Sequence, residues 1–149
     1  MDDLLRKFTD WIPWSARKDI SKEILQSPGV YVMGCFDSAT PSGKPMLSQK
    51  IVYIGETCDR SLRVRLYEFG RSAFDNKPAH SGGATFHAEY ENEIVGSEAP
   101  SWLYLSILAV PDVNASRSAA FQSRQRFRSM TGKSSFENWR TYGPLVKMA

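Results

Sequence analysis

The chain has 149 residues, a formal net charge of +3, two cysteines and two histidines. This length predicts one domain over residues 1–149, and no apolar run is long enough to cross a membrane. Cys35 and Cys58 are too few for a disulfide framework or a four-cysteine zinc site, and the acidic residues at positions 2 and 3 are unlike a signal peptide, so a cytoplasmic location is expected.

The segment before the first predicted strand is expected to be a packed lead-in followed by a helix. Residues 4–14 are rich in apolar side chains but end in Ile-Pro-Trp, which favours a lead-in or a short helix. Ser15 is the expected N-cap of a helix over residues 16–26, and Ser-Pro-Gly at 27–29 ends that helix.

Two β-rich runs follow, at residues 30–33 and 51–54. Residues 37–45 between them are rich in Pro, Gly, Ser and Asp, which are turn residues. The two runs are therefore predicted to pair as an antiparallel hairpin with a long loop. Residues 61–69 then carry apolar side chains at helical spacing, which predicts a helix.

Residues 84–90 alternate between apolar and polar side chains, which favours a strand, with a short helix as the alternative. Residues 102–110 are almost continuously apolar and end at Pro111, as a buried strand would. Residues 116–130 are predicted to form a basic helix with Gly132 as its C-cap. This order of elements predicts an α/β fold, a small sandwich in which helices flank an antiparallel or mixed sheet of about three strands.

Basic residues gather in two places, and both are candidates to neutralise nucleic-acid phosphates. The alternative for each cluster is a solvated helix face. The first cluster has Glu68 as its only acid and contains Arg60, Arg63, Arg65 and Arg71. The second has no acid and contains Arg117, Arg124, Arg126, Arg128 and Lys133.

Five features of the sequence come in an order typical of one nuclease superfamily. Gly-Val-Tyr at 29–31 lies on the first strand, and Tyr-Ile-Gly at 53–55 lies on its partner. An arginine on the next helix follows, with Arg65 the best match and Arg63 its rival, then the late basic helix and finally Asn138. The chain therefore resembles a GIY-YIG endonuclease domain, with residues 28–139 as the core and residues 1–27 as a lead-in.

The resemblance implies hydrolysis of phosphodiester bonds in duplex DNA, with Mg²⁺ or another divalent cation as cofactor. It also implies that Tyr53 orients or deprotonates the attacking water while Tyr31 supports it. A phenol has an ordinary pKa of about 10, so it needs nearby cations to act as a base at neutral pH. Arg65 is expected at the scissile phosphate, because a guanidinium makes two-point contacts with phosphate oxygens.

His-Ser-Gly-Gly at 80–83 is similar to a His-x-Gly-Gly string in restriction-type members of the superfamily. His80 is therefore expected to touch phosphate or relay a proton, and the alternative is a loop histidine beside a glycine turn. The superfamily also places a metal-binding glutamate on the late helix. Counting back from Gly132 and Asn138 puts this position at Gln122, with Ala120 as second choice, and neither residue supplies the anionic oxygen that Mg²⁺ prefers.

Three explanations of the missing carboxylate stay open. The chain is an inactivated variant of a nuclease, or a natural member kept for binding, or another acid supplies the ligand. The candidates for that acid are Glu56, Glu89, Glu91 and Glu137. The competing functions are a catalytically silent module that binds DNA or a partner protein and a plain α/β protein. A homodimer is compatible with the nuclease interpretation, because a two-fold assembly can cut both strands.

Overall fold

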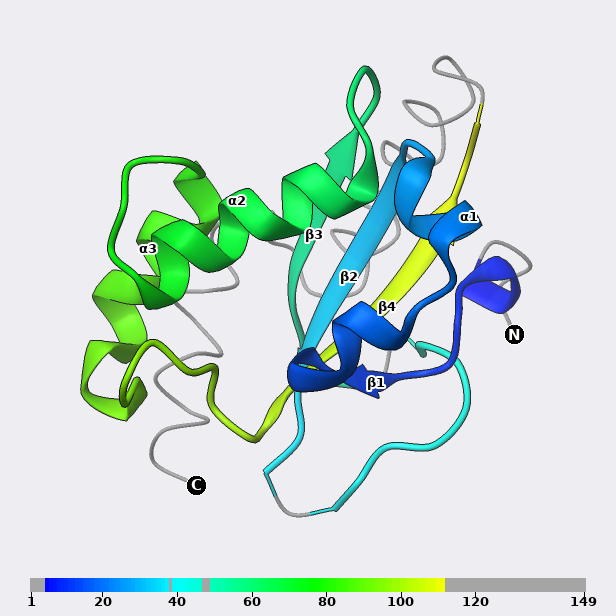
Figure 1. Ribbon diagram of the computed structural model, residues 1–149. Coiled ribbons are helices and arrows are strands. Elements are labelled where there is room, and N and C mark those ends of the chain that lie inside the picture. The colour runs from blue at the N-terminus through cyan, green and yellow to red at the C-terminus, as the bar shows by residue number, and fades with distance from the viewer. Residues whose placement is uncertain (1–4, 38, 47–48, 112–149) are drawn as a thin grey trace, which may run out of the picture.

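The computed structural model describes residues 5–37, 39–46 and 49–111. They form a four-stranded antiparallel sheet against which two main helices pack (Figure 1). The strand order is β1-β4-β2-β3. The strands are β1 (Ile12–Pro13), β2 (Gly29–Cys35), β3 (Ile51–Thr57) and β4 (Leu103–Ala109). The predicted α/β fold with helices on an antiparallel sheet is confirmed, and β1 is a short strand that the sequence did not indicate.

The hairpin of β2 and β3 is the part of the sheet that matters for function. The two strands are antiparallel, with Tyr31 opposite Gly55 and Met33 opposite Tyr53. On its other side β2 pairs with β4 along its whole length, and every residue of β2 is buried. Both the hairpin and the apolar strand before Pro111 were predicted correctly, because their apolar runs are bounded by clear turn residues.

Side chains alternate across the sheet and divide the core in two. On one face, β2 and β4 contribute to the cluster that packs against the helices, and its strand residues include Tyr31, Met33, Leu103, Leu105 and Ile107. The other face carries Val30, Val32, Ile54 and Leu108. The amino-terminal segment covers this second face with Leu5 of η1 (Leu5–Lys7), Phe8 and Trp11.

Helix α2 (Leu62–Phe74) follows the hairpin and is longer than the segment predicted. Its N-cap is Ser61, whose side chain accepts a hydrogen bond from the Val64 amide. Its buried stripe packs into the helical core cluster and consists of Leu62, Leu66, Phe69 and Ala73. The i, i+4, i+7 spacing of Leu62, Leu66 and Phe69 is the reason that the sequence indicated a helix here, and Ala73 continues this spacing.

The strand favoured for residues 84–90 is wrong: this segment belongs to helix α3 (Ser81–Tyr90), which is followed by the 3₁₀ helix η3 (Glu91–Glu93). Phe86 and Tyr90 are four residues apart and both are fully buried, so they lie on one helical face. The segment lies against α2 rather than at a sheet edge. Alternation over seven residues fits either structure, and here tertiary packing decides between them.

The helix predicted over residues 16–26 is also wrong in detail. A 3₁₀ helix, η2 (Trp14–Asp19), and a short α1 (Lys22–Gln26) are separated at Ile20, where the backbone is extended. The N-cap of α1 is Ser21 rather than Ser15, and its hydroxyl accepts from the Ile24 amide. A serine in the middle of a helical pattern favours a new cap over a continuous helix.

Across the described ranges, no helix is both long and apolar enough to cross a membrane. The basic helix predicted for residues 116–130, with its C-cap at Gly132, lies outside these ranges.

Candidate active site

The hairpin register places Tyr31 and Tyr53 on the same face of the sheet. They occupy diagonal positions on β2 and β3, and their ring centroids are 6.0 Å apart. The ring of Tyr31 lies across Gly55, where a Cβ atom would overlap it. The glycine of the second motif therefore provides the space for the tyrosine of the first.

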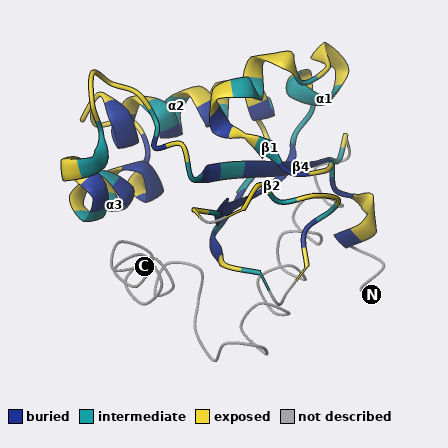
Figure 2. Cartoon of the chain, turned by 90° about the horizontal axis from the view of Figure 1, so that it is seen from below, coloured by how far each residue is buried: buried dark blue, intermediate teal, exposed yellow. Residues whose placement is uncertain are grey.

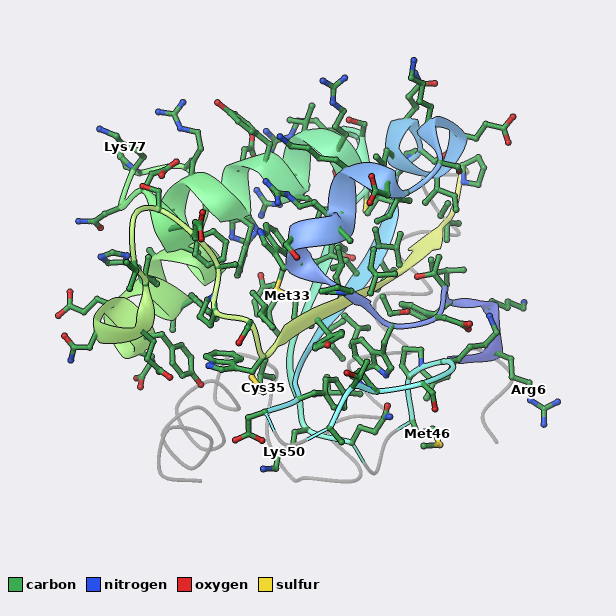
Figure 3. All side chains as sticks on the ribbon, turned by 60° about the horizontal axis from the view of Figure 1, so that its bottom comes forward. Arg6, Met33, Cys35, Met46, Lys50 and Lys77 are labelled. Carbon is green, nitrogen blue, oxygen red and sulfur yellow. The ribbon has the colours of Figure 1, made fainter. Side chains whose placement is uncertain are left out.

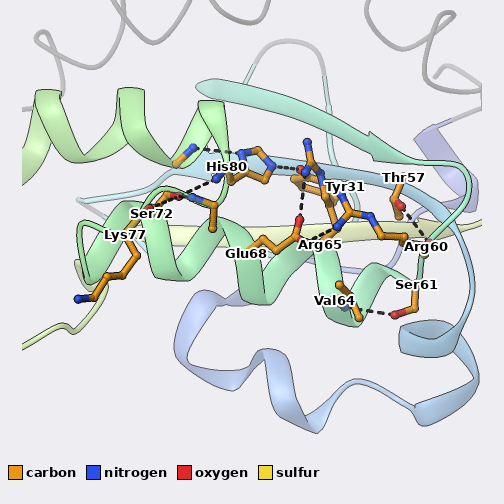
Figure 4. Close-up of polar contacts among 12 residues, drawn as sticks. Tyr31, Thr57, Arg60, Ser61, Val64, Arg65, Glu68, Ser72, Lys77 and His80 are labelled. Carbon is orange, nitrogen blue, oxygen red and sulfur yellow. Dashed lines mark hydrogen bonds and ion pairs between the residues drawn. The ribbon is translucent and has the colours of Figure 1, made fainter.

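His80 joins this pair from the start of α3. Its Nε2 is 2.8 Å from the hydroxyl oxygen of Tyr31, and its Nδ1 accepts a hydrogen bond from the Gly83 amide at 3.2 Å (Figure 4). His80 is only 4% exposed. Burial, and then the positive charge of Arg65, lower the pKa of His80 from 6.5 to about 4. His80 is therefore neutral at pH 7.

These contacts assign the tautomer of His80. Because Nδ1 accepts the Gly83 hydrogen bond, the single proton of the neutral ring lies on Nε2, and this N–H donates to the oxygen of Tyr31. The hydrogen of the Tyr31 hydroxyl must then point to a different acceptor. Two separate motifs of the sequence thus form one directed hydrogen-bond chain from the Gly83 amide through the imidazole to the phenol.

Ser72 of α2 fixes the turn that carries His80. Its hydroxyl accepts from the backbone amides of Ala79 at 3.0 Å and His80 at 2.7 Å, and it donates to the carbonyl of Lys77 at 2.7 Å. The sequence analysis missed Ser72. Ser72 lies on the same side of α2 as Arg65 and Glu68, which are seven and four residues earlier, but this place in the helical repeat does not by itself indicate a contact with the turn.

Arg65 approaches the tyrosines from α2 and is ion-paired with Glu68, one turn further along, at 3.1 Å. Arg60 pairs with the other carboxylate oxygen of Glu68 (Figure 4). Burial lowers the pKa of Arg65, but Tyr31 and Glu68 outweigh this effect, so the pKa is raised and the guanidinium stays charged. Two arginines therefore share a single carboxylate beside the phenols.

Tyr31 itself is fully buried. Burial first, and then the neighbouring Tyr53, raise its pKa well above the ordinary value, while Arg65 acts in the opposite direction. Tyr31 is therefore protonated at neutral pH. Tyr53 lies on the same face but is only partly buried, and its ring packs against Gly82 of α3.

The structure separates the predicted site residues into three groups. Tyr31, Tyr53, Arg65 and His80 lie together, with Arg60 at the edge through Glu68. Arg63 and Arg71 are exposed and lie on a different side of α2 from Arg65. The remaining predicted residues are outside the described ranges: Arg117, Ala120, Gln122, Arg124, Arg126, Arg128, Lys133, Glu137 and Asn138.

The described residues do not form a divalent-metal site by themselves. Within these ranges no three His, Cys, Asp or Glu side chains gather closely enough to hold an ion. Glu68 is already paired with two arginines, and Glu56 pairs in register with Val30, which faces the opposite side of the sheet from Tyr31. Glu89 lies at the far end of α3 from His80. We therefore assign no metal ligand from this part of the chain.

No family model, curated protein or solved structure matches this chain. The resemblance to GIY-YIG nucleases accordingly rests on the order of the motifs in the sequence.

Proposed function

We propose that the chain is a GIY-YIG-type nuclease domain that hydrolyses phosphodiester bonds in DNA. The observation that carries this proposal is the 2.8 Å contact between Tyr31 and His80, which are 49 residues apart, in a cluster with Tyr53 and Arg65. Two phenols, a charged guanidinium and a neutral imidazole on one face of a hairpin suit an anionic substrate that needs charge stabilisation and an activated water.

The electrostatics favour different roles for the two tyrosines. Tyr31 is buried, has a raised pKa and accepts a hydrogen bond from His80. It therefore keeps its own hydroxyl proton, which it can donate in a hydrogen bond, and it is not the proposed base. Tyr53 is the more exposed phenol and is the proposed base for the attacking water. His80 is assigned neither proton relay nor phosphate contact, because both of its ring nitrogens are engaged within the protein.

Arg65 is the proposed phosphate ligand. Its guanidinium is half-buried beside Tyr31, and its bond to Glu68 uses only part of a fork with five N–H donors. A planar guanidinium held in this way can donate hydrogen bonds to two oxygens of a phosphate. Its positive charge stabilises the negative charge that grows on these oxygens during attack by water.

A divalent cation would neutralise phosphate charge and assist the departing oxygen. The described residues do not form a site that fits one. By sequence count the position for its carboxylate ligand is Gln122 or Ala120. Neither residue carries the negative charge of a carboxylate. This favours a second candidate function, a module on the same fold that binds DNA without cutting it.

Cleavage of a labelled duplex in the presence and absence of Mg²⁺ separates the two functions. We expect Gln122→Glu to create or raise Mg²⁺-dependent cleavage, because the substitution restores an anionic ligand. Adding Tyr53→Phe to that variant should lower the rate by about 10²- to 10⁴-fold, the contribution of a general base, without loss of DNA binding. Tyr104→Phe is the matched control, since Tyr104 packs with the other core cluster.

If Gln122→Glu and Ala120→Glu are both inert while DNA still binds, the silent module is correct. If the Tyr53→Phe variant cuts as fast as its parent, the proposed base is wrong. Arg65→Ala provides an independent check, because the loss of a phosphate ligand in the transition state should reduce cleavage far more than binding.

A further inference from the structure

The outer side of α2 carries a stripe of exposed residues, Arg63, Val64, Tyr67 and Arg71. Tyr67 is 60% exposed and Val64 is 41% exposed, although large apolar side chains of this helix are otherwise buried. Figure 2 shows the contrast between the buried side of α2 and its exposed outer side. The stripe lies opposite the residues that pack on the sheet, so core packing does not account for it.

The stripe combines an aromatic ring with two cations. Arg63, Tyr67 and Arg71 are spaced by four residues, so they follow one another along the helix over about 12 Å. The guanidinium carbon of Arg71 lies 5.9 Å from the centroid of the Tyr67 ring. An exposed phenol is thus flanked by a guanidinium on each side, and one of them already contacts the ring.

The charge of this outer side is positive. The only acid within α2 is Glu68, and it pairs with Arg60 and Arg65 on the side of the candidate active site. The next acid, Asp75, is the C-cap beyond the stripe. Lys77 adds a cation from the turn after the helix, whereas Arg6 and Lys50 extend from the opposite side of the molecule (Figure 3).

We propose that this stripe binds single-stranded nucleic acid, with Tyr67 stacked on an unpaired base and Arg63 and Arg71 on phosphates. Bases inside a duplex are stacked on one another and offer no free face to a side chain, whereas unpaired bases stack readily on exposed aromatic rings. The stripe is about 12 Å long, so it can contact a few consecutive nucleotides of one strand. Two exposed arginines on this stripe complement the row of phosphate charges along that strand.

This inference goes beyond the proposed nuclease function, because the stripe is on a different side of α2 from Arg65 and its binding requires no hydrolysis. In a nuclease it would favour DNA that carries an unpaired segment beside the cleaved duplex. In a silent module it would itself be the binding site.

Fluorescence anisotropy of a labelled oligothymidine of about 15 nucleotides, longer than the stripe, tests the proposal. The measurement is made in EDTA, so that cleavage does not interfere, and a blunt duplex of the same length is measured in parallel. We expect the single strand to bind more tightly than the duplex. Tyr67→Ala should weaken single-strand binding about tenfold, and Tyr67→Phe should retain it, because a phenyl ring preserves stacking.

The salt dependence tests the arginines. Arg63→Gln and Arg71→Gln should each reduce the slope of log affinity against log salt by about 0.7, the value for one phosphate of a single strand. Val95→Ala is the matched surface control, since Val95 is 77% exposed and lies outside the stripe.

Three outcomes would overturn the proposal: Tyr67→Ala binds the single strand like the parent, Tyr67→Phe is as weak as Tyr67→Ala, or the duplex competes equally well. Tyr53→Phe, made in the Gln122→Glu variant, separates this proposal from the nuclease function. If that variant loses cleavage and keeps single-strand binding, both proposals stand. If no variant cleaves DNA but Tyr67→Ala still weakens binding, only the nuclease function fails.

Discussion

At the scale of single residues, the protonation state of His80 decides which hydrogen bonds form in the candidate site. Its side chain caps α3 through Nδ1 and contacts Tyr31 through Nε2, and the cap requires the neutral ring because Nδ1 accepts the hydrogen bond from the Gly83 amide. Burial beside Arg65 supports the same state, because it lowers the pKa of His80 to about 4. A protonated ring would put a hydrogen on Nδ1 and lose the Gly83 bond while Nε2 keeps its N–H for Tyr31, so acid should loosen the start of α3.

We therefore predict an acid-sensitive stability that depends on His80. The folded protein binds the His80 proton less readily than the unfolded chain, whose histidine has the ordinary pKa of 6.5. As pH falls from about 6.5 towards about 4, the unfolded state takes up this proton first, so the free energy of unfolding decreases. Above about 6.5 this contribution is constant.

Nitrogen-15 NMR of the histidine rings checks this prediction directly. At pH 7 the His80 ring should show a protonated Nε2 and an unprotonated Nδ1, and it should titrate below pH 5. The second histidine, His87, is an internal comparison in the same spectrum because it lies on another part of α3. A His80 ring that titrates near pH 6.5, or that carries its proton on Nδ1, would contradict the assignment.

At the scale of elements, α3 is positioned by close contact with α2 near Gly83. A Cβ atom at Gly83 would lie 2.6 Å from the carbonyl oxygen of Phe69 and 2.7 Å from the Cβ of Ser72. Because Ser72 also holds the turn before α3, the two helices and the turn form one unit around His80. The site geometry therefore depends on this helix pair as much as on the hairpin.

Two glycine-to-alanine substitutions should have opposite effects. Gly83→Ala should lower the free energy of unfolding by about 1–3 kcal/mol, because the added methyl group overpacks the helix contact. Gly70→Ala on α2 is the matched control, since its Cβ would meet Trp14 only at an ordinary 3.4 Å. It should raise the free energy of unfolding by up to about 1 kcal/mol through helix propensity. Urea denaturation measures both, and a neutral Gly83→Ala would show that the contact is not tight.

The elements also show which features the sequence could predict. The placement of Tyr31 and Tyr53 on one face of the sheet follows from period-two alternation in two strands joined by a recognisable loop, so it was accessible. The helix at 81–90 was not, because its alternation resembles a strand and its N-cap is a histidine, which is outside the usual set of capping residues. The role of Ser72 depends on a turn that only the packed helix pair defines, so local pattern carries no direct sign of it.

At the scale of the whole molecule, the sheet is covered on both faces, and the amino-terminal segment provides the second cover. Thr9 connects this segment to β4 through hydrogen bonds. The Thr9 amide donates to the Ile107 carbonyl at 2.8 Å, and the Ile107 amide donates to the Thr9 hydroxyl at 3.0 Å. Ser106 donates to the Thr9 carbonyl at 2.5 Å. The segment before residue 28 is thus more than a lead-in, because it completes one of the two core clusters.

Phe8 tests this dependence. It is 1% exposed and packs on the sheet face opposite Tyr31, so Phe8→Ala should lower the free energy of unfolding by about 3–5 kcal/mol. That loss is a large fraction of the ~5–15 kcal/mol typical of a domain. Lys7→Ala is the matched control, because Lys7 is the exposed neighbour and its loss should change little.

The same strand connects this cover to the candidate site, since Val30 and Val32 of β2 pack towards Phe8 while Tyr31 between them faces His80. Urea unfolding followed by tryptophan fluorescence and by far-ultraviolet circular dichroism should therefore give one shared transition for the parent and for Phe8→Ala, at lower urea for the variant. If Phe8→Ala instead separates an early loss of the amino-terminal segment from a later loss of the sheet and helices, the two clusters unfold independently. The hairpin with Tyr31 would then be stable without its second cover.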